Sequence, residues 1–435
     1  MTERRALLAL AIPLAAQHVG NTLMGAVDAA MLGRYSDAAL AGAGVANNLL
    51  FATVSIGVGI VMGMDTVVPQ ALGAGRIDDA RRAVGAGIRL AILVGLLATL
   101  AMFAMPLVMR AAHVKATVLA EATPYIYLRA VGVVPQLIMV ALRSFLAAHH
   151  KTRPLVVGVI VGNVVNLVLD YILIYPAGLG VIGAALATTV VQLAQMAIYL
   201  ASARSIYPDS APASTTADLR KVLHYGAPVG GQILAEVGIF GVATVISANL
   251  GEIQAAAHAI ALNISSLTFS FVMGVASATS VLVGKAVGAR EFVLARSRGF
   301  LGMRIGLAVM AVFALAFLVI PGPLTRLFTN ERIVIDATIP LLMIAALFQL
   351  SDSTQTIAAG ALRGLGHTKE TLYGNLVGHY VIALPVMFGL AFGAQLGIVG
   401  VWWGLSAGLT ATAIYLVLRF IRGCKRLPEE HPQPI

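Results

Sequence analysis

Long apolar stretches alternate with short polar loops along almost the whole chain. Each stretch runs for about twenty residues or more with few charged side chains, which is the length that an α-helix needs to cross the hydrocarbon core of a bilayer. The pattern predicts twelve membrane-spanning helices, at residues 6–33, 42–72, 83–108, 120–148, 154–174, 180–203, 223–248, 256–287, 297–320, 336–362, 372–393 and 397–420. The predicted fold class is therefore an all-α integral membrane protein.

The overall composition supports the same fold class. Of 435 residues, 59% are hydrophobic and only 11% are charged, and the mean hydropathy is +0.90. Such a composition excludes intrinsic disorder and a soluble enzyme, because a soluble fold could not bury this much apolar surface. The single cysteine, Cys424, leaves no disulfide framework and no clustered thiolate metal site.

The net charge of +10 is distributed in the way that membrane insertion requires. A nucleic-acid-binding surface gathers basic residues on one solvated face, whereas here they are scattered among short loops, so no nucleic-acid partner is expected. If the N-terminus is cytosolic, 23 of the 29 Lys and Arg residues fall on the cytosolic side. The opposite side holds only Arg34, Arg110, Lys115, Arg326 and Arg332, and Arg129 lies inside the fourth span. The positive-inside rule therefore predicts that both termini are cytosolic.

The chain contains two copies of one six-helix unit. A shift of 215 positions, without a gap from residue 13 to residue 89, pairs Pro13 with Pro228, Gln17 with Gln232, Asn48 with Asn263 and Gly59 with Gly274. The segment Ala-Leu-Arg at 141–143 recurs at 361–363. The repeat predicts an N-terminal lobe at 1–203, a cytosolic linker at 204–222, a C-terminal lobe at 223–422 and a cytosolic tail at 423–435.

The even number of helices in each copy determines how the two lobes are related. Both copies enter the membrane in the same sense, so we expect a pseudo-twofold axis along the membrane normal and a central cleft between two six-helix lobes. Two lobes that rock around a site near the bilayer midplane are the architecture of secondary transporters. The fold thus favours transport by alternating access.

Away from the first and last two residues of each predicted span, five acidic residues fall inside the spans: Asp28, Asp65, Asp170, Glu236 and Asp352. Each costs on the order of 2.5 to 3.5 kcal/mol at a helix centre, so most of them must be paired, protonated or bound to a cation. Asp65 lies about two turns from the basic loop at 76–82, and pairing there explains it without a functional site.

The first lobe is predicted to hold one acidic site. Asn166 and Asp170 are four residues apart and therefore share one helical face, which Asn163 extends by another turn. Asp28 has only small neighbours and no basic residue near it in sequence, so it needs a partner from another helix. The alternative interpretation is a hydrogen-bonded structural aspartate.

The second lobe is predicted to hold a second acidic site. Gln232 and Glu236 share a face of the seventh span, and Asp352 and Gln355 share a face of the tenth. Alternatively, Glu236 and Asp352 share a proton as a structural bridge. We expect the following amides to line the substrate cleft: Gln17, Asn163, Gln232 and Gln355.

Motifs of catalysis are weak or missing. Residues 404–408 match G-x-S-x-G, the motif of a serine nucleophile that follows a strand and precedes its catalytic histidine. Here an apolar helix surrounds the serine, and the one histidine that follows it in sequence is His431, in the tail. The sequence has no HExxH motif, Walker A loop or dinucleotide fingerprint. We therefore predict that the protein is not an enzyme and that an ion gradient supplies the energy.

The chain resembles the multidrug and toxic compound extrusion (MATE) family over nearly its whole length. The resemblance rests on the 6 + 6 organisation, on Q-A-L-G-A at 70–74, on its counterpart K-A-V-G-A at 285–289, and on A-L-R-G-L-G at 361–366. It implies a first-lobe cation site at Asp28, Asn166, Asp170 and Thr188. The segment at 226–237 and the segment F-Q-L-S-D at 348–352 resemble the NorM-like branch, which implies that Glu236 and Asp352 are cation or substrate carboxylates.

This resemblance also implies the activity. A family member exchanges protons or sodium ions for amphipathic, often cationic, organic compounds and needs no cofactor. We accordingly expect a monomer in the lipid bilayer of a bacterial inner membrane, with small organic cations or drugs as partners. The alternative is a lipid-linked precursor flippase of the same superfamily, although the first-lobe carboxylates, with no matching basic cavity, argue against it. A major-facilitator antiporter ranks third, because the loop at 72–82 lacks the expected basic motif.

Pro13 is the predicted hinge. It lies fifteen residues before Asp28 inside the first span and cannot donate the backbone hydrogen bond of a helix interior. Ion binding at Asp28 is therefore expected to bend the first helix there. Pro228 holds the matching position before Glu236, and the alternative is that both prolines only shape the cleft.

Overall fold

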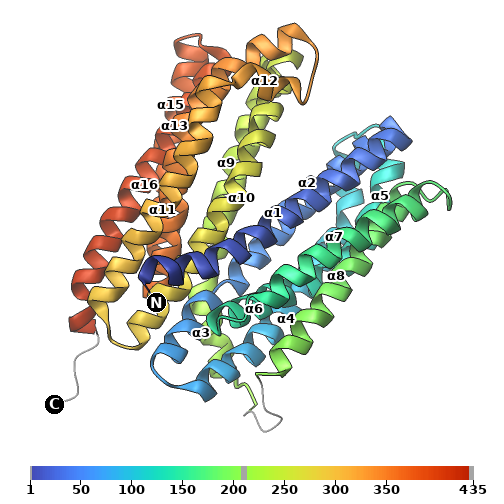
Figure 1. The fold of residues 1–435 in the computed structure, drawn as a ribbon. Coiled ribbons are helices and arrows are strands. Elements are labelled where there is room, and N and C mark those ends of the chain that lie inside the picture. The colour runs from blue at the N-terminus through green and yellow to red at the C-terminus, as the bar shows by residue number, and fades with distance from the viewer. Residues whose placement is uncertain (1, 207–212, 431–435) are drawn as a thin grey trace. The chain divides into compact units, whose positions relative to one another are not determined.

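A computed structural model of the protein describes residues 2–206 and 213–430 (Figure 1). Within these ranges the chain is helical with no β-strand, and eleven helices are long and apolar enough to cross a membrane. A further pair, α5 (Ala116–Val131) and α6 (Val133–Ala148), passes the same test together and is bent by 43°. The count is twelve if this pair forms one span. The predicted all-α membrane fold is confirmed.

The helices gather into two compact units. The N-unit consists of Ala16–Leu72 and Arg76–Gly230, and the C-unit consists of Met1–Ala15, Gly73–Gly75 and Gly231–Ile435. Each unit contains most of one sequence repeat, which agrees with the two-lobe prediction. Of the predicted linker at 204–222, residues 207–212 lie outside the described residues. The predicted tail at 423–435 overlaps the last helix, and its residues 431–435 also lie outside them.

The N-unit is built from eight helices and the start of a ninth, and α1 and α9 are divided within their length between the two units. They are the second part of α1 (Glu3–Tyr35), then α2 (Asp37–Val61), α3 (Met64–Gly73), α4 (Ile77–Ala111), α5, α6, α7 (Arg153–Ile174) and α8 (Val181–Arg204), and the start of α9 (Thr216–Leu250) lies against them. The fourth span breaks at Gly132, between α5 and α6. Pro135 explains the break, because it cannot donate a hydrogen bond to the carbonyl of Val131.

The C-unit has α13 (Arg332–Leu365) at its centre, packed against α10 (Glu252–Gly288), α11 (Phe292–Val319) and α16 (Gly397–Glu430) (Figure 1). The remaining elements are α12 (Pro321–Arg326), α14 (Thr368–Leu376), η1 (Val377–Ala383), α15 (Leu384–Phe388) and η2 (Gly389–Gly393). Phe348 and Trp402 lie in the core, with ring centroids 5.6 Å apart. The helix α13 ends at Gly366, whose φ of 89° is a conformation that glycine adopts without strain.

The leading helix of each repeat is divided between the two units. In α1 the division falls between Ala15 and Ala16, and in α9 it falls 215 positions later, between Gly230 and Gly231. Each division therefore lies two residues after a proline, Pro13 or Pro228.

Matching glycine contacts hold the exchanged helix ends. In the N-unit a Cβ atom on Gly59 would overlap the backbone of Gly230, and in the C-unit a Cβ atom on Gly274 would overlap the backbone of Ala15. Gly59 and Gly274 are equivalent positions of the repeat, as are Ala15 and Gly230. Glycine is required here because it lets two helix backbones approach closely.

We expect Gly274→Ala to lower the stability of the protein by about 1 to 3 kcal/mol, the range for an overpacked interior. The matched control is Gly44→Ala, since a Cβ atom there would meet nothing within 4 Å. The control should be neutral or slightly stabilising, because alanine favours the helix over glycine. Thermal unfolding in detergent measures both variants, and equal melting temperatures would refute the packing argument.

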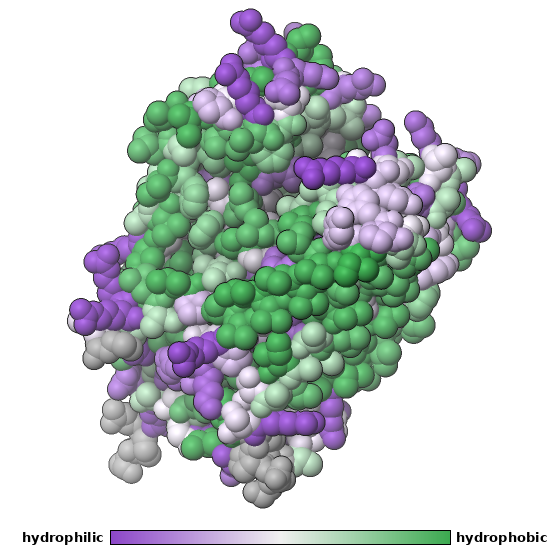
Figure 2. Space-filling model, turned by 45° about the vertical axis from the view of Figure 1, so that its right-hand side comes forward, coloured by the Kyte–Doolittle hydropathy of each residue, from purple (hydrophilic) through white to green (hydrophobic). Residues whose placement is uncertain are grey.

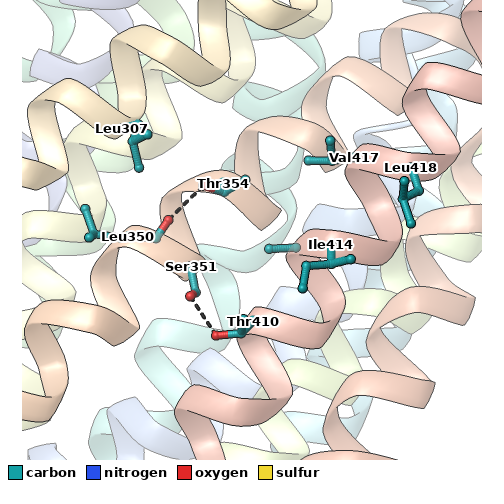
Figure 3. A pocket seen from close by; sticks show the side chains of 9 residues that line it. Leu307, Leu350, Ser351, Thr354, Thr410, Ile414, Val417 and Leu418 are labelled. Atoms are coloured by element: carbon teal, nitrogen blue, oxygen red, sulfur yellow. Dashed lines mark hydrogen bonds between the residues drawn. The ribbon is translucent and has the colours of Figure 1, made fainter.

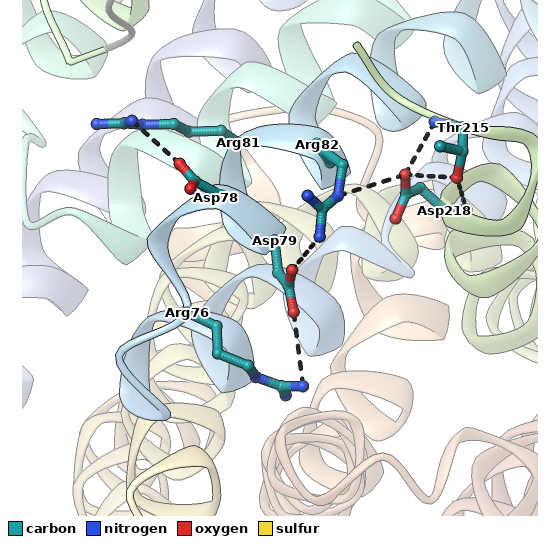
Figure 4. Close-up of polar contacts among 7 residues, drawn as sticks. All are labelled: Arg76, Asp78, Asp79, Arg81, Arg82, Thr215 and Asp218. Carbon is teal, nitrogen blue, oxygen red and sulfur yellow. Dashed lines mark hydrogen bonds and ion pairs between the residues drawn. The ribbon is translucent and has the colours of Figure 1, made fainter. Parts of the chain in front are cut away.

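The start of α9 is fixed by a capping box and an ion pair within the N-unit (Figure 4). The Asp218 carboxylate accepts from the backbone N–H of Thr215 at 2.9 Å, and the Asp218 N–H donates to the Thr215 hydroxyl at 3.2 Å. Arg82 of α4 lies 3.8 Å from the Asp218 carboxylate and also pairs with Asp79. These partly exposed pairs contribute at most about 1 kcal/mol each to stability. Their main effect is therefore to fix the position at which α9 begins.

The outer faces of the helices are apolar. In α4 the side chains of Leu97, Leu100 and Leu107 are exposed, and α7 exposes Ile160 and Val164. On the face shown in Figure 2, hydrophobic residues cover the long sides of the helices and hydrophilic residues gather near their ends. Apolar faces of this extent are stable only against lipid, so the chain is a multi-pass membrane protein.

Candidate ion and substrate sites

Three helices of the N-unit bring four predicted residues together. The hydroxyl of Thr188 on α8 lies 2.9 Å from the Asp28 carboxylate on α1 and donates to it, and it is also within reach of the Ala184 carbonyl. Asp170 and Asn166 on α7 face the same place, and the side chain of Asp170 interacts with both Asp28 and Asn166. The three side chains of Asp28, Asn166 and Asp170 are at most 4% exposed.

Most polar atoms of this cluster have no hydrogen bond within the part of the chain that the structure describes. Among the described residues, Asp28 Oδ1, both carboxylate oxygens of Asp170 and both amide atoms of Asn166 are buried without a hydrogen bond. Two neighbouring carboxylates buried in this way are unfavourable unless a proton or a cation joins them. Carboxylate, amide and hydroxyl oxygens are also the ligands that hard cations prefer. The donor set therefore fits a proton or a sodium ion.

The described residues contain no group of three or more His, Cys, Asp or Glu side chains arranged to hold a metal ion. The N-unit cluster differs from such a site because it combines two carboxylates with neutral oxygens.

Sequence reasoning missed Tyr125 and Asn47 beside the cluster. Tyr125 on α5 is almost fully buried, donates its hydroxyl to Asn47 Oδ1 at 3.2 Å, and lies within electrostatic range of Asp28 and Asp170. The sequence pattern did not distinguish Tyr125, because an aromatic residue in an apolar span is most simply interpreted as a core residue. A buried tyrosine usually needs a hydrogen-bond partner, and that requirement was the available signal.

The two amides predicted for the cleft in the first lobe are bonded elsewhere in the N-unit. Gln17 donates to the hydroxyl of Tyr199 at 3.2 Å, and Asn163 donates to the carbonyl of Val159 on its own helix at 2.8 Å. Neither has a hydrogen bond to Asp170. Their role in substrate binding stays a prediction.

The C-unit brings together the second set of predicted residues. Gln232, one turn before Glu236 on α9, and Gln355 on α13 both donate to Glu236 Oε1, at 3.1 Å and 3.0 Å. Asp352 on α13 is 8% exposed and interacts electrostatically with Glu236. The Oε1 atoms of Gln232 and Gln355 are buried without a partner among the described residues. Glu236 is thus held in place while oxygen atoms around it remain available.

A buried arginine stands at the same position of the repeat in each unit, and neither was predicted as a site residue. Arg363 on α13 is 4% exposed and acts electrostatically on Glu236. Its repeat counterpart, Arg143 on α6, is 7% exposed and has Nη1 3.4 Å from His18 Nε2. The repeated segment Ala-Leu-Arg was the sequence signal, since a charge retained inside both copies is costly without a role.

Comparison with known proteins gives an independent view of the repeat. The MatE family model matches residues 13–172 and again residues 228–388. The two matches begin 215 positions apart, which is the shift that relates the two halves of the sequence.

Known proteins are similar to this chain over nearly its whole length. The "Probable multidrug resistance protein NorM" of Pseudomonas putida is 34% identical and covers 98% of this chain and 96% of its own length. The "Multidrug resistance protein MdtK" of Pectobacterium atrosepticum is 30% identical, with 98% and 97% covered.

Solved structures share the fold. An outward-facing multidrug resistance MATE family transporter of the MOP superfamily superimposes with a TM-score of 0.89 at 19% identity, covering 99% of this chain and 97% of that one. A MOP superfamily transporter from Pyrococcus furiosus gives a TM-score of 0.90 at 20% identity, with 98% and 97% covered. At this identity the likeness establishes the fold.

Proposed function

The chain belongs to the MatE family, and from this premise we propose that it is a multidrug efflux transporter of a bacterial inner membrane. The relatives named as multidrug resistance proteins are similar over nearly the full length, so the whole transport architecture is shared. Members of this family are transporters rather than enzymes, and they need no cofactor. The expected substrates are amphipathic organic compounds, many of them cationic.

The N-unit cluster is the proposed coupling site of an antiporter. The observation that carries this proposal is the pair Asp28 and Asp170, buried together with unpaired oxygen atoms. A proton or a sodium ion that binds between them removes a penalty of several kcal/mol, and its release restores that penalty. Ion binding can therefore bias one conformation of the transporter over another.

The C-unit cluster is the proposed attraction point for cationic substrates. Glu236 and Asp352 concentrate negative charge, and the free amide oxygens of Gln232 and Gln355 can accept hydrogen bonds from a bound cation. Such a site favours a cationic compound over the anionic pyrophosphate of a lipid-linked precursor. This preference supports drug efflux over the alternative flippase activity.

The orientation and the assembly state complete the proposal. The excess of Lys and Arg in alternate loops supports cytosolic termini. Each proposed site is formed by helices of one unit in one chain, so a monomer suffices for function. We keep the lobe limits 1–203 and 223–422, joined by the cytosolic linker at 204–222 and followed by the tail at 423–435, as the sequence repeat defines them.

The direct test is reconstitution of the purified protein into vesicles. Efflux of a fluorescent cationic dye is followed after a proton gradient or a sodium gradient is imposed separately. We expect one of the two ions to drive efflux in the native protein. Dye movement that responds to neither gradient would refute antiport, and accumulation of a lipid-linked pyrophosphate in the opposite leaflet would support the flippase instead.

Pro13 is the proposed hinge that connects ion binding to movement. It lies two residues before the point where α1 passes from the C-unit to the N-unit, and Pro228 has the same relation to α9. A proline inside a membrane helix leaves one backbone carbonyl without its usual donor and weakens the helix there. A bend at this point would move Asp28 relative to Asn166 and Asp170.

We expect Pro13→Ala to stiffen α1 and to reduce its ion-dependent movement. Spin labels on α1 and α7, within the N-unit, report the distance across a pH or sodium titration. In the native protein the distance distribution should shift with ion binding, and in Pro13→Ala the shift should shrink. Pro106→Ala, in α4, is the matched control, because that proline lies far from any unit boundary in sequence. Identical distances under all conditions in the native protein would exclude bending and leave the prolines a structural role.

A further inference from the structure

A surface groove of the C-unit lies outside both proposed sites. It is bounded by α11, α13 and α16 and has a volume of about 340 Å³ (Figure 3). Its apolar lining includes Leu307, Leu350, Ala413, Ile414 and Leu418. Leu307, Ile414 and Leu418 are 43%, 58% and 48% exposed, so the groove opens to the surroundings of the protein. In a membrane helix such a surface faces acyl chains.

The three hydroxyl groups in the groove are already bonded within the protein. Ser351 and Thr410 lie 2.8 Å apart and form a hydrogen bond, and Thr354 donates to the carbonyl of Leu350 at 2.8 Å (Figure 3). Thr410 is also 2.7 Å from the Ser406 carbonyl. Because these hydroxyls are satisfied, the lining offers little to a polar ligand and suits a hydrocarbon chain. The stretch of α16 from Thr410 to Leu418 is about 12 Å long, which is close to the depth of one leaflet, about 15 Å.

Two arginines, Arg304 and Arg422, lie beyond one end of the groove. α11 and α16 run antiparallel there, because Gly299 contacts Phe420 while Leu307 and Ile414 line the groove together. Arg304 is therefore one turn past Leu307 and Arg422 one turn past Leu418, both in the same direction.

Both arginines are exposed, and neither has an ion pair among the described residues. Their neighbour Arg419 differs, since it pairs with Glu370 at 3.0 Å. Two free cations next to an apolar groove match the chemistry of a phosphate that carries acyl chains.

The first repeat does not preserve this arrangement. Arg89, the counterpart of Arg304, donates to the backbone carbonyl of Ser214 at 2.7 Å. The shift of 217 positions that pairs residues 179–183 with 396–400 places Ser205 opposite Arg422. In the first repeat, the counterpart of Arg304 is therefore bonded to the backbone, and the counterpart of Arg422 is an uncharged serine. The feature belongs to the second repeat alone and is not a by-product of the fold.

We propose that this groove binds an anionic phospholipid, with one acyl chain along α16 and the phosphate between Arg304 and Arg422. A purely apolar ligand would leave the two arginines without a partner, so it is not the preferred occupant. A fully polar ligand would find no free hydroxyl group in the groove, because all three are bonded within the protein. A zwitterionic lipid offers the same chains, but its own cation opposes the two arginines. The site therefore selects lipids by headgroup charge.

Native mass spectrometry of the detergent-purified protein tests the proposal by lipid titration. The probes are phosphatidylglycerol, phosphatidylcholine with the same chains, and glycerol phosphate without chains. We expect phosphatidylglycerol to bind tightest and glycerol phosphate not to be retained. The double variant Arg304→Gln/Arg422→Gln should weaken phosphatidylglycerol binding roughly tenfold or more and leave phosphatidylcholine unchanged.

The matched control removes two exposed arginines elsewhere, Arg153→Gln/Arg220→Gln, and should retain phosphatidylglycerol binding. A second variant, Ala413→Leu, fills the groove and should reduce binding at an unchanged melting temperature; if it unfolds the protein, the two charge variants decide. Equal loss in both double variants would overturn the proposal in favour of non-specific charge attraction. Equal affinity of the native protein for the two phospholipids would overturn it as well.

Discussion

Asp28→Asn and Asp170→Asn are each expected to abolish ion-coupled efflux while the protein stays folded. The Thr188 hydroxyl can still donate to an amide oxygen at position 28, so this hydrogen bond is kept. The new amide group can in turn donate to the unpaired carboxylate of Asp170. What is lost is the buried charge, whose penalty of about 2.5 to 3.5 kcal/mol is the energy that ion binding releases. A loss of that size corresponds to a fall in coupled transport of roughly 100-fold.

The measurement compares dye efflux from vesicles under the driving gradient with thermal unfolding of the same preparations. Asp336→Asn is the control, because this carboxylate is exposed and its ion pair, with Arg332 at 3.9 Å, is exposed as well. We expect the control to transport normally and the two buried variants to melt at or slightly above the native temperature. A double Asn variant that still transports with unchanged ion dependence would remove the coupling role from this cluster.

The spans were predictable because hydropathy alone requires them, but their interruptions were not. Every predicted span corresponds to helix, and the helices run further than the apolar stretches, as α16 does by continuing to Glu430. The last turns of these helices contain polar residues, which hydropathy does not detect. The predicted spans therefore end before the helices do. The break at Gly132 leaves the apolar pattern of the fourth span unchanged, and the π-helical segments η1 and η2, which pack against α16, have no hydropathy signal either.

The candidate sites were predictable where neighbours on one helix form them. Asn166 with Asp170, and Gln232 with Glu236, follow from spacing by four residues. Contacts between helices needed more, since no spacing relates Asp28 to Thr188, and only the resemblance to a family supplied that pair.

The exchange of helix ends between units could not be predicted from the sequence. A repeat shows where one copy ends and the next begins, and it thereby suggests a division in the linker. The packing of Gly59 on Gly230 and of Gly274 on Ala15 instead divides α1 and α9 within their length. The glycines were visible as matched positions, but a small residue does not identify the helix that it contacts.

Glu236→Gln is expected to weaken the binding of a cationic dye about tenfold, or ~1.4 kcal/mol. Both Gln232 and Gln355 donate to one carboxylate oxygen, and an amide oxygen can accept the same two hydrogen bonds. The substitution therefore keeps the local geometry and removes only the charge. The Asp352 carboxyl group stays in the site, so the loss should be partial. Glu236→Gln/Asp352→Asn should lower the affinity further, but the two losses should not add, because the two carboxyl groups interact electrostatically.

Equilibrium binding of a fluorescent cationic dye and of a neutral analogue distinguishes the two interpretations of this carboxylate. If Glu236 attracts the substrate, only the cationic dye loses affinity, and the neutral analogue binds as it does to the native protein. If Glu236 and Asp352 form a structural bridge, the melting temperature changes while dye affinity does not. Glu252→Gln, at the exposed first turn of α10, removes an equal charge and should leave both measurements unchanged. Unaltered affinity for the cationic dye in Glu236→Gln would therefore assign this carboxylate to the fold and leave the search for the substrate site to the N-unit amides.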